Sequence, residues 1–155
     1  MNKIKMSKNN FKQAVESTPD VAKCYQNGYQ ALGKYSKKVE PTDKSKCEGS
    51  IDIDDCTVIK YPNANRWDYA VGYDGKVVFI EVHSANTSQV SVVLKKLQWL
   101  KDWLETHAPE IKILKMHEPA FIWVRSGKNY ILPNDNRMRN AAAKGIYIDN
   151  KAKLE

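Results

Sequence analysis

Long apolar runs are missing from this 155-residue sequence. No stretch approaches the roughly 20 apolar residues that a membrane-spanning helix needs. The first ten residues, MNKIKMSKNN, are basic and polar, and no apolar segment follows them. We therefore expect no membrane partner and a cytoplasmic location. The length predicts a single domain over residues 1–155, with a core large enough to need no metal or disulfide for folding.

Cysteine is also scarce, with only Cys24, Cys47 and Cys56 in the chain. An odd number at these spacings fits neither a CxxC redox pair nor a zinc site. We expect a reducing compartment and three unpaired cysteines that act as small hydrophobic residues.

Basic residues are in excess, giving a formal net charge of +7. Such a charge is typical of proteins that meet polyanions, because lysine and arginine displace counterions from phosphates. Residues 34–49 predict an exposed basic loop, and a short helix after residue 134 carries further cations. The candidate contacts with a nucleic-acid backbone are Lys34, Lys37, Lys38, Lys44, Lys46, Arg137, Arg139 and Lys144.

The order of elements favours an α/β (α+β) fold with a central mixed sheet of four to five strands flanked by helices. Residues 1–18 predict an N-terminal arm or a weak helix, and residues 19–32 a stronger amphipathic helix. Alternating apolar residues predict strands over 50–61, 66–73 and 76–83. A long helix over 88–106, one or two strands over 119–132 and a last short helix follow.

The dipeptide Asp74-Gly75 predicts a tight hairpin turn between the second and third strands. In that register Asp68 lies opposite Glu81 on one face of the sheet, and His83 projects from the same face. Two like charges so placed favour a bound cation such as Mg²⁺ or Mn²⁺. The alternative is a solvent-exposed strand end, neutralised by Arg66 or a lysine without any metal.

The segment WDYAVGYDGKVVFIEVHSA resembles the motif of the PD-(D/E)xK nuclease superfamily, which has a restriction-endonuclease-like fold. The resemblance implies a core of helix, three strands, helix and strand. It implies that Asp68 and Glu81, with the Val82 carbonyl, bind Mg²⁺ or Mn²⁺, and that His83 replaces the catalytic lysine of the motif. The implied activity is phosphodiester cleavage in DNA or RNA, with a homodimer as one arrangement for cutting two strands.

Histidine does not supply the fixed charge of lysine, so another cation would have to take that role or activity would be lost. The alternative function is therefore an inactive nuclease-fold module that binds nucleic acid or a protein. Asp54 could add a carboxylate, although the alternation in IDIDD favours a half-exposed strand. The accessory candidates are Glu16, Asp54, Gln89, Lys95 and Lys96.

Overall fold

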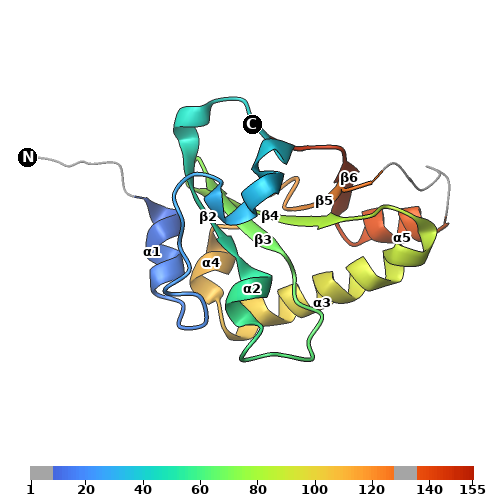
Figure 1. Cartoon of the computed structure of the whole chain (residues 1–155), viewed down its shortest axis with the longest axis horizontal. Helices are drawn as coiled ribbons and strands as arrows, with labels where there is room; N and C mark the ends of the chain where they lie inside the picture. Colours follow the sequence, from blue (N-terminus) through green and yellow to red (C-terminus); the bar gives the residue numbers. More distant parts are fainter. Residues whose placement is uncertain (1–8, 128–135) are drawn as a thin grey trace, which may run out of the picture.

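The computed structural model describes residues 9–127 and 136–155, which form a mixed α+β fold around a five-stranded sheet (Figure 1). The strands, in the spatial order of the sheet, are β2 (Cys47–Asp52), β3 (Tyr69–Tyr73), β4 (Lys76–His83), β5 (Phe121–Arg125) and β6 (Ile146–Asp149). Neighbours β2, β3 and β4 pair antiparallel, whereas β5 and β6 run parallel to β4. The expected mixed sheet flanked by helices is confirmed.

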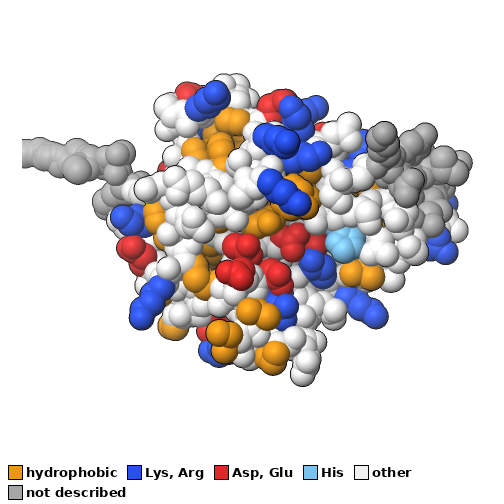
Figure 2. Space-filling view, viewed as in Figure 1, with side chains coloured by type: hydrophobic (Ala, Val, Ile, Leu, Met, Phe, Trp, Pro, Cys, Tyr) orange, Lys and Arg blue, Asp and Glu red, His pale blue; other side chains and the backbone are white. Residues whose placement is uncertain are grey.

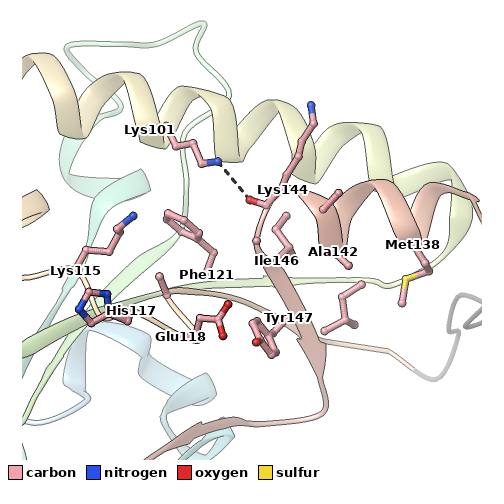
Figure 3. A pocket seen from close by; sticks show the side chains of 14 residues that line it. Lys101, Lys115, His117, Glu118, Phe121, Met138, Ala142, Lys144, Ile146 and Tyr147 are labelled. Carbon is pink, nitrogen blue, oxygen red and sulfur yellow. Dashed lines mark hydrogen bonds between the residues drawn. The ribbon is translucent and has the colours of Figure 1, made fainter.

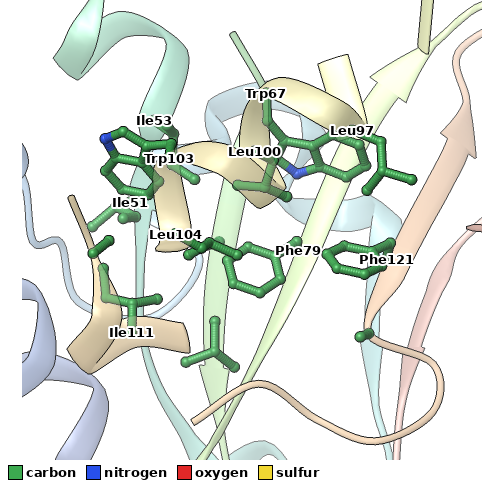
Figure 4. Packing of buried hydrophobic residues seen from close by; sticks show 14 of the residues in the cluster. Ile51, Ile53, Trp67, Phe79, Leu97, Leu100, Trp103, Leu104, Ile111 and Phe121 are labelled. Carbon is green, nitrogen blue, oxygen red and sulfur yellow. The ribbon is translucent and has the colours of Figure 1, made fainter. Parts of the chain in front are cut away.

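One face of the sheet is covered by helices. They are α1 (Asn10–Glu16), α3 (Val90–Thr106), α4 (Pro109–Ile113) and α5 (Asn136–Ala143), with the short α2 (Ile53–Thr57) at the edge. Helix α3 buries an apolar stripe at helical spacing, including Leu97, Leu100 and Leu104, as the sequence predicts. These side chains pack against Phe79 and Phe121 of the sheet (Figure 4). No helix in the described parts of the chain is long and apolar enough to cross a membrane.

The other face of the sheet is covered by a separate small layer. The 3₁₀ helix η1 (Gln30–Lys38) packs there beside a parallel pair formed by β1 (Val39–Pro41) and β7 (Ala152–Leu154). Two further 3₁₀ turns are η2 (Lys44–Lys46) and η3 (Thr87–Gln89). Residues 34–49, expected as an exposed basic loop, thus hold the end of η1, β1, η2 and the start of β2.

The amphipathic helix expected over residues 19–32 does not form, whereas the weaker helix before it does. Gln26 instead exchanges two backbone hydrogen bonds of 2.9 Å with Ser50 at the edge of the sheet. Gly28 then reverses the chain with a φ of +54°. Pairing with β2 satisfies backbone groups that a helix would have satisfied internally, so tertiary contacts override the helical pattern.

Two of the three cysteines are paired, because a disulfide joins Cys24 to Cys56 with a Cα–Cα distance of 6.4 Å. The expectation of three unpaired cysteines is therefore wrong, and only Cys47 remains a thiol. The bond ties the irregular N-terminal segment to α2, across a sequence separation of 32 residues. Helix α1 is held more directly, since a Cβ at Gly72 of β3 would lie 2.5 Å from the Phe11 side chain.

Candidate active site

The hairpin register places Asp68 and Glu81 next to each other, as the sequence predicts. The pairs Tyr69–Ile80 and Tyr73–Lys76 continue directly to Asp68 and Glu81. The two acids also bind each other's strands: the Asp68 amide donates to Glu81 Oε1 at 3.1 Å, and the Val82 amide donates to Asp68 Oδ2 at 3.0 Å. One oxygen of each carboxylate is thereby fixed by backbone, which orients the second oxygen toward a common point.

Lys96 of α3 occupies that common point. Its Nζ lies 3.2 Å from Asp68 Oδ1 and donates a short hydrogen bond to Glu81 Oε2. Lys96 is positioned by α3. Val93, Leu97 and Leu100 of this helix are buried, so the side of the helix that carries Lys96 faces the sheet. Of the two lysines expected as replacements for the motif lysine, Lys96 enters the site, whereas Lys95 is exposed.

The electrostatics of this cluster are governed by burial. The Glu81 side chain is 0% exposed, and its burial, followed by the charge of Asp68, raises its pKa to about 8 despite Lys96. Burial disfavours the Lys96 ammonium as well, but the charges of Glu81 and Asp68 outweigh this effect and raise the pKa of Lys96. Lys96 therefore stays charged at neutral pH, whereas the Glu81 carboxyl, even beside Lys96, ionises only as the pH approaches 8.

His83 lies beside the acid pair at the end of β4, with its Nδ1 3.8 Å from Glu81 Oε2. Its Nε2 contacts Gln89 Oε1 of η3 at 2.6 Å. Because an amide oxygen only accepts hydrogen bonds, Nε2 is the donor in this contact, and Nδ1 is the ring nitrogen directed toward Glu81. The predicted accessory Gln89 thus orients His83, with Nδ1 toward the acids.

Arg125 is a candidate that the sequence reasoning missed. It pairs with His83 across β4 and β5, at the carboxyl end of both strands. Its Nε is buried without a hydrogen-bond partner, and Arg125 makes no salt bridge within the described residues. The side chain of Lys38, one of the predicted phosphate contacts, reaches the Arg125 carbonyl at 3.4 Å. The only sequence signal was an arginine that ends an apolar strand.

Two other predicted accessory acids, Asp54 and Glu16, lie outside the site. Asp54 lies in α2, not in a strand, and its Oδ1 accepts a 2.8 Å hydrogen bond from Arg66 Nε. Arg66 is therefore not the cation that neutralises the acid pair. Glu16 is exposed at the end of α1 and lines a different surface hollow, with Lys12.

Asp52 has an electrostatic link to the acid pair through Asp68. It pairs with Tyr69, next to Asp68, and its Oδ1 caps α2 by accepting the Asp55 amide at 2.9 Å. Burial raises the pKa of Asp52 to about 6; the hydrogen bond from the Asp55 amide opposes this shift, and the charges of Asp55, Asp54 and Asp68 add to it. Figure 2 shows acidic side chains gathered near the centre of this face, with a histidine beside them and basic side chains around.

The predicted phosphate contacts do not form one surface. Lys46 pairs with Asp74 at 3.7 Å, at the turn of the hairpin and so at the opposite end from Glu81. Lys44 lies in the same 3₁₀ turn, while Lys37 and Lys38 end η1 on the side of Arg125. Arg137 and Arg139 are exposed on α5. The basic residues thus divide into groups, of which the one with Lys38 lies beside Arg125, the strand neighbour of His83.

The donor set fits a hard divalent cation, although it is not a preformed cage. Asp68 Oδ1 and Glu81 Oε2 point to the same place. The predicted third ligand, the Val82 carbonyl, lies at the same end of β4. Carboxylate and carbonyl oxygens are the ligands that Mg²⁺ and Mn²⁺ take, usually with waters and a substrate phosphate. Among the residues described, no group of three or more His, Cys, Asp or Glu side chains is arranged to hold a metal ion.

Comparison with known proteins gives no relative, since no family model, no curated protein and no solved structure matches this chain.

Proposed function

We propose that the chain is a metal-dependent phosphodiesterase that cleaves nucleic acid, with a restriction-endonuclease-like core. The observation that carries the proposal is the convergence of Asp68, Glu81 and Lys96 on one point at a strand end. Two acids and a lysine are the residue types of the PD-(D/E)xK motif, with the lysine supplied by α3 instead of β4. The element order α1, β2, β3, β4, α3 and β5 also agrees with the core of that superfamily.

The residues divide the work of hydrolysis between them. Asp68 and Glu81, with the Val82 carbonyl, would hold Mg²⁺ or Mn²⁺. Such an ion lowers the pKa of a bound water and neutralises charge on the phosphoryl oxygens. His83 accepts the proton of the attacking water at Nδ1, in an orientation fixed by Gln89.

The cations stabilise the charge that develops on the phosphate. The Lys96 ammonium lies between the acids, and with a metal ion held by these acids it would be free to contact a phosphoryl oxygen. Arg125 adds a guanidinium whose Nε has no partner, and Lys38 Nζ contacts the backbone carbonyl of the same residue. Arginine suits this task because its planar fork matches the geometry of a phosphate.

The Lys96 ion pairs also support a second function, that of a catalytically inactive module that binds nucleic acid. In that case the ammonium permanently replaces the divalent ion, because each carboxylate oxygen already has a partner. The basic residues Lys38 and Arg125 would still contact a phosphate backbone, with binding that weakens steeply as salt is added.

Cleavage assays separate the two functions. Supercoiled plasmid, single-stranded DNA and single-stranded RNA are incubated with the protein and Mg²⁺, Mn²⁺ or EDTA. The enzyme proposal predicts cleavage that requires the metal and falls at least 100-fold in Asp68→Asn and Glu81→Gln. Asp102→Asn is the matched control. Asp102 is exposed on α3, and its substitution also replaces one carboxylate by an amide. Binding without cleavage in any metal would support the inactive module.

A further inference from the structure

A second hollow, with a volume of about 660 Å³, lies between α3, α5 and the first residues of β5 and β6 (Figure 3). Its lining includes none of the residues of the acid pair. The volume is within the roughly 300–1,000 Å³ of small-molecule sites. The apolar part of the lining includes Phe121, Ile146, Ile148 and Met138, and Tyr147, which is 47% exposed, stands at its side.

Three lysines, Lys101, Lys115 and Lys144, meet at this hollow, against a single carboxylate from Glu118. Within the described part of the chain, none of the three forms a salt bridge with an acid. The ammonium groups of Lys101 and Lys115 lie 5.6 and 5.5 Å from the centre of the Phe121 ring. Figure 3 shows them on two sides of that ring.

This concentration of positive charge is unfavourable without an anion. Burial, and then the charges of Lys115 and Lys144, lower the pKa of Lys101. Lys101 donates a 3.3 Å hydrogen bond to the Lys144 carbonyl at the end of α5, a position where the helix dipole favours a cation. That contact explains Lys101 alone. It does not explain why Lys115, which follows α4 in the chain, also lies beside the Phe121 ring.

We propose that this hollow binds a small phosphate monoester with a ring, the chemistry of a nucleoside monophosphate. The phosphate contacts the lysines that line the hollow, since lysine binds phosphate as a point charge. The apolar lining with Tyr147 takes the ring, because a phosphate ion alone leaves most of the hollow empty. Glu118 accepts a hydrogen bond from a hydroxyl or amino group, and its charge disfavours an extended polyanion.

Titration calorimetry on the full chain tests the site, independently of any cleavage activity. The probes are AMP, GMP, CMP, UMP and ribose 5-phosphate, with adenosine as the uncharged control and an unphosphorylated oligonucleotide as the polyanion. We expect at least one phosphate monoester to bind, adenosine to bind at least 10-fold more weakly, and affinity to fall with salt. Lys101→Gln and Lys115→Gln should each weaken binding about 10-fold or more.

Lys151→Gln is the matched control. Lys151 pairs with Glu40 of β1, on the face of the sheet opposite α3, and the substitution removes one positive charge as the other two do. It should leave the affinity unchanged. Lys101→Gln should keep or raise the melting temperature, since it relieves repulsion between lysines, so that lost binding would not reflect lost folding. The proposal is overturned if no monoester binds, if both lysine variants bind normally, or if the oligonucleotide alone binds at these lysines.

Discussion

Replacing Lys96 by methionine removes the only cation found between Asp68 and Glu81 in the described structure and keeps an aliphatic side chain. At the 3.2 Å between Lys96 Nζ and Asp68 Oδ1, a unit charge pair is worth about 5 kcal/mol at an effective dielectric constant near 20. Desolvation of the ammonium offsets part of this energy. Breaking a buried pair by removing one partner typically costs about 3–5 kcal/mol, and we expect Lys96→Met to lose that much stability.

Urea unfolding followed by tryptophan fluorescence measures the loss, because Trp67 and Trp123 are fully buried. A pH of 8.5 is suitable, since it lies above the pKa of Glu81, which is about 8. Lys96→Met combined with Glu81→Gln should be less destabilised than the sum of the single changes by about 2 kcal/mol or more. Mn²⁺ should raise the melting temperature of Lys96→Met more than that of the wild type.

Two results would refute this reasoning. If Lys96→Met is as stable as the wild type, the ammonium does not neutralise the acids in solution. If the single changes are additive, Lys96 and Glu81 do not interact energetically, and the short contact between them has no influence on the cluster.

Three further predictions concern pH, the disulfide and the packing of the hairpin. The folded-state pKa of Glu81 is raised from 4.5 to about 8, so its contribution to stability is present below pH 4.5 and is lost as the pH rises through 8; from pH 5 to 8.5 the wild type should lose up to about 4 kcal/mol relative to Glu81→Gln in urea unfolding, and parallel curves would contradict this. Replacing Cys24 and Cys56 by serine should cost about 3–4 kcal/mol, because the bond closes a loop with a sequence separation of 32, and equal melting temperatures with and without reductant would argue against the bond. Gly72→Ala forces a Cβ into the side chain of α1 and should cost about 2 kcal/mol or more, whereas Gly127→Ala, which meets nothing within 4 Å, should be nearly neutral by thermal unfolding; similar effects of the two changes would count against the packing.

The sequence predicts the centre of the fold well, because the strongest local signals lie there. Asp74-Gly75 determines the hairpin register, and the register alone brings Asp68 and Glu81 together. The long helix is equally predictable from its apolar spacing. These elements contain the acid pair, so the candidate site is largely visible before any coordinates.

The periphery is less predictable, because its structure depends on contacts between distant segments. Gln26 pairs with Ser50 at the edge of the sheet, where the sequence predicts a helix. Cys24 forms its disulfide with Cys56, which lies 32 residues further along the chain. The parallel pairing of β1 with β7 joins residues 39–41 to residues 152–154 and has no local signal. The second strand expected before residue 132 lies outside the described residues, while β6 forms after α5 instead.

Within the site, too, the sequence leaves open which of two neighbouring lysines, Lys95 or Lys96, contacts the acids. Both lysines follow one another on α3, and the sequence alone leaves both open. The buried stripe of α3 decides the orientation, and only Lys96 then faces the sheet. Arg125 was missed for a related reason, since its proximity to His83 depends on the parallel pairing of β4 with β5.

Binding of Mn²⁺ to the purified chain, measured by titration calorimetry, is the most direct test of the acid pair as a metal site. We predict one strong Mn²⁺ site in the wild type and in Asp102→Asn, and its loss in both Asp68→Asn and Glu81→Gln. Equal Mn²⁺ binding by all four proteins, or no binding by the wild type, would contradict the proposed metal-dependent chemistry.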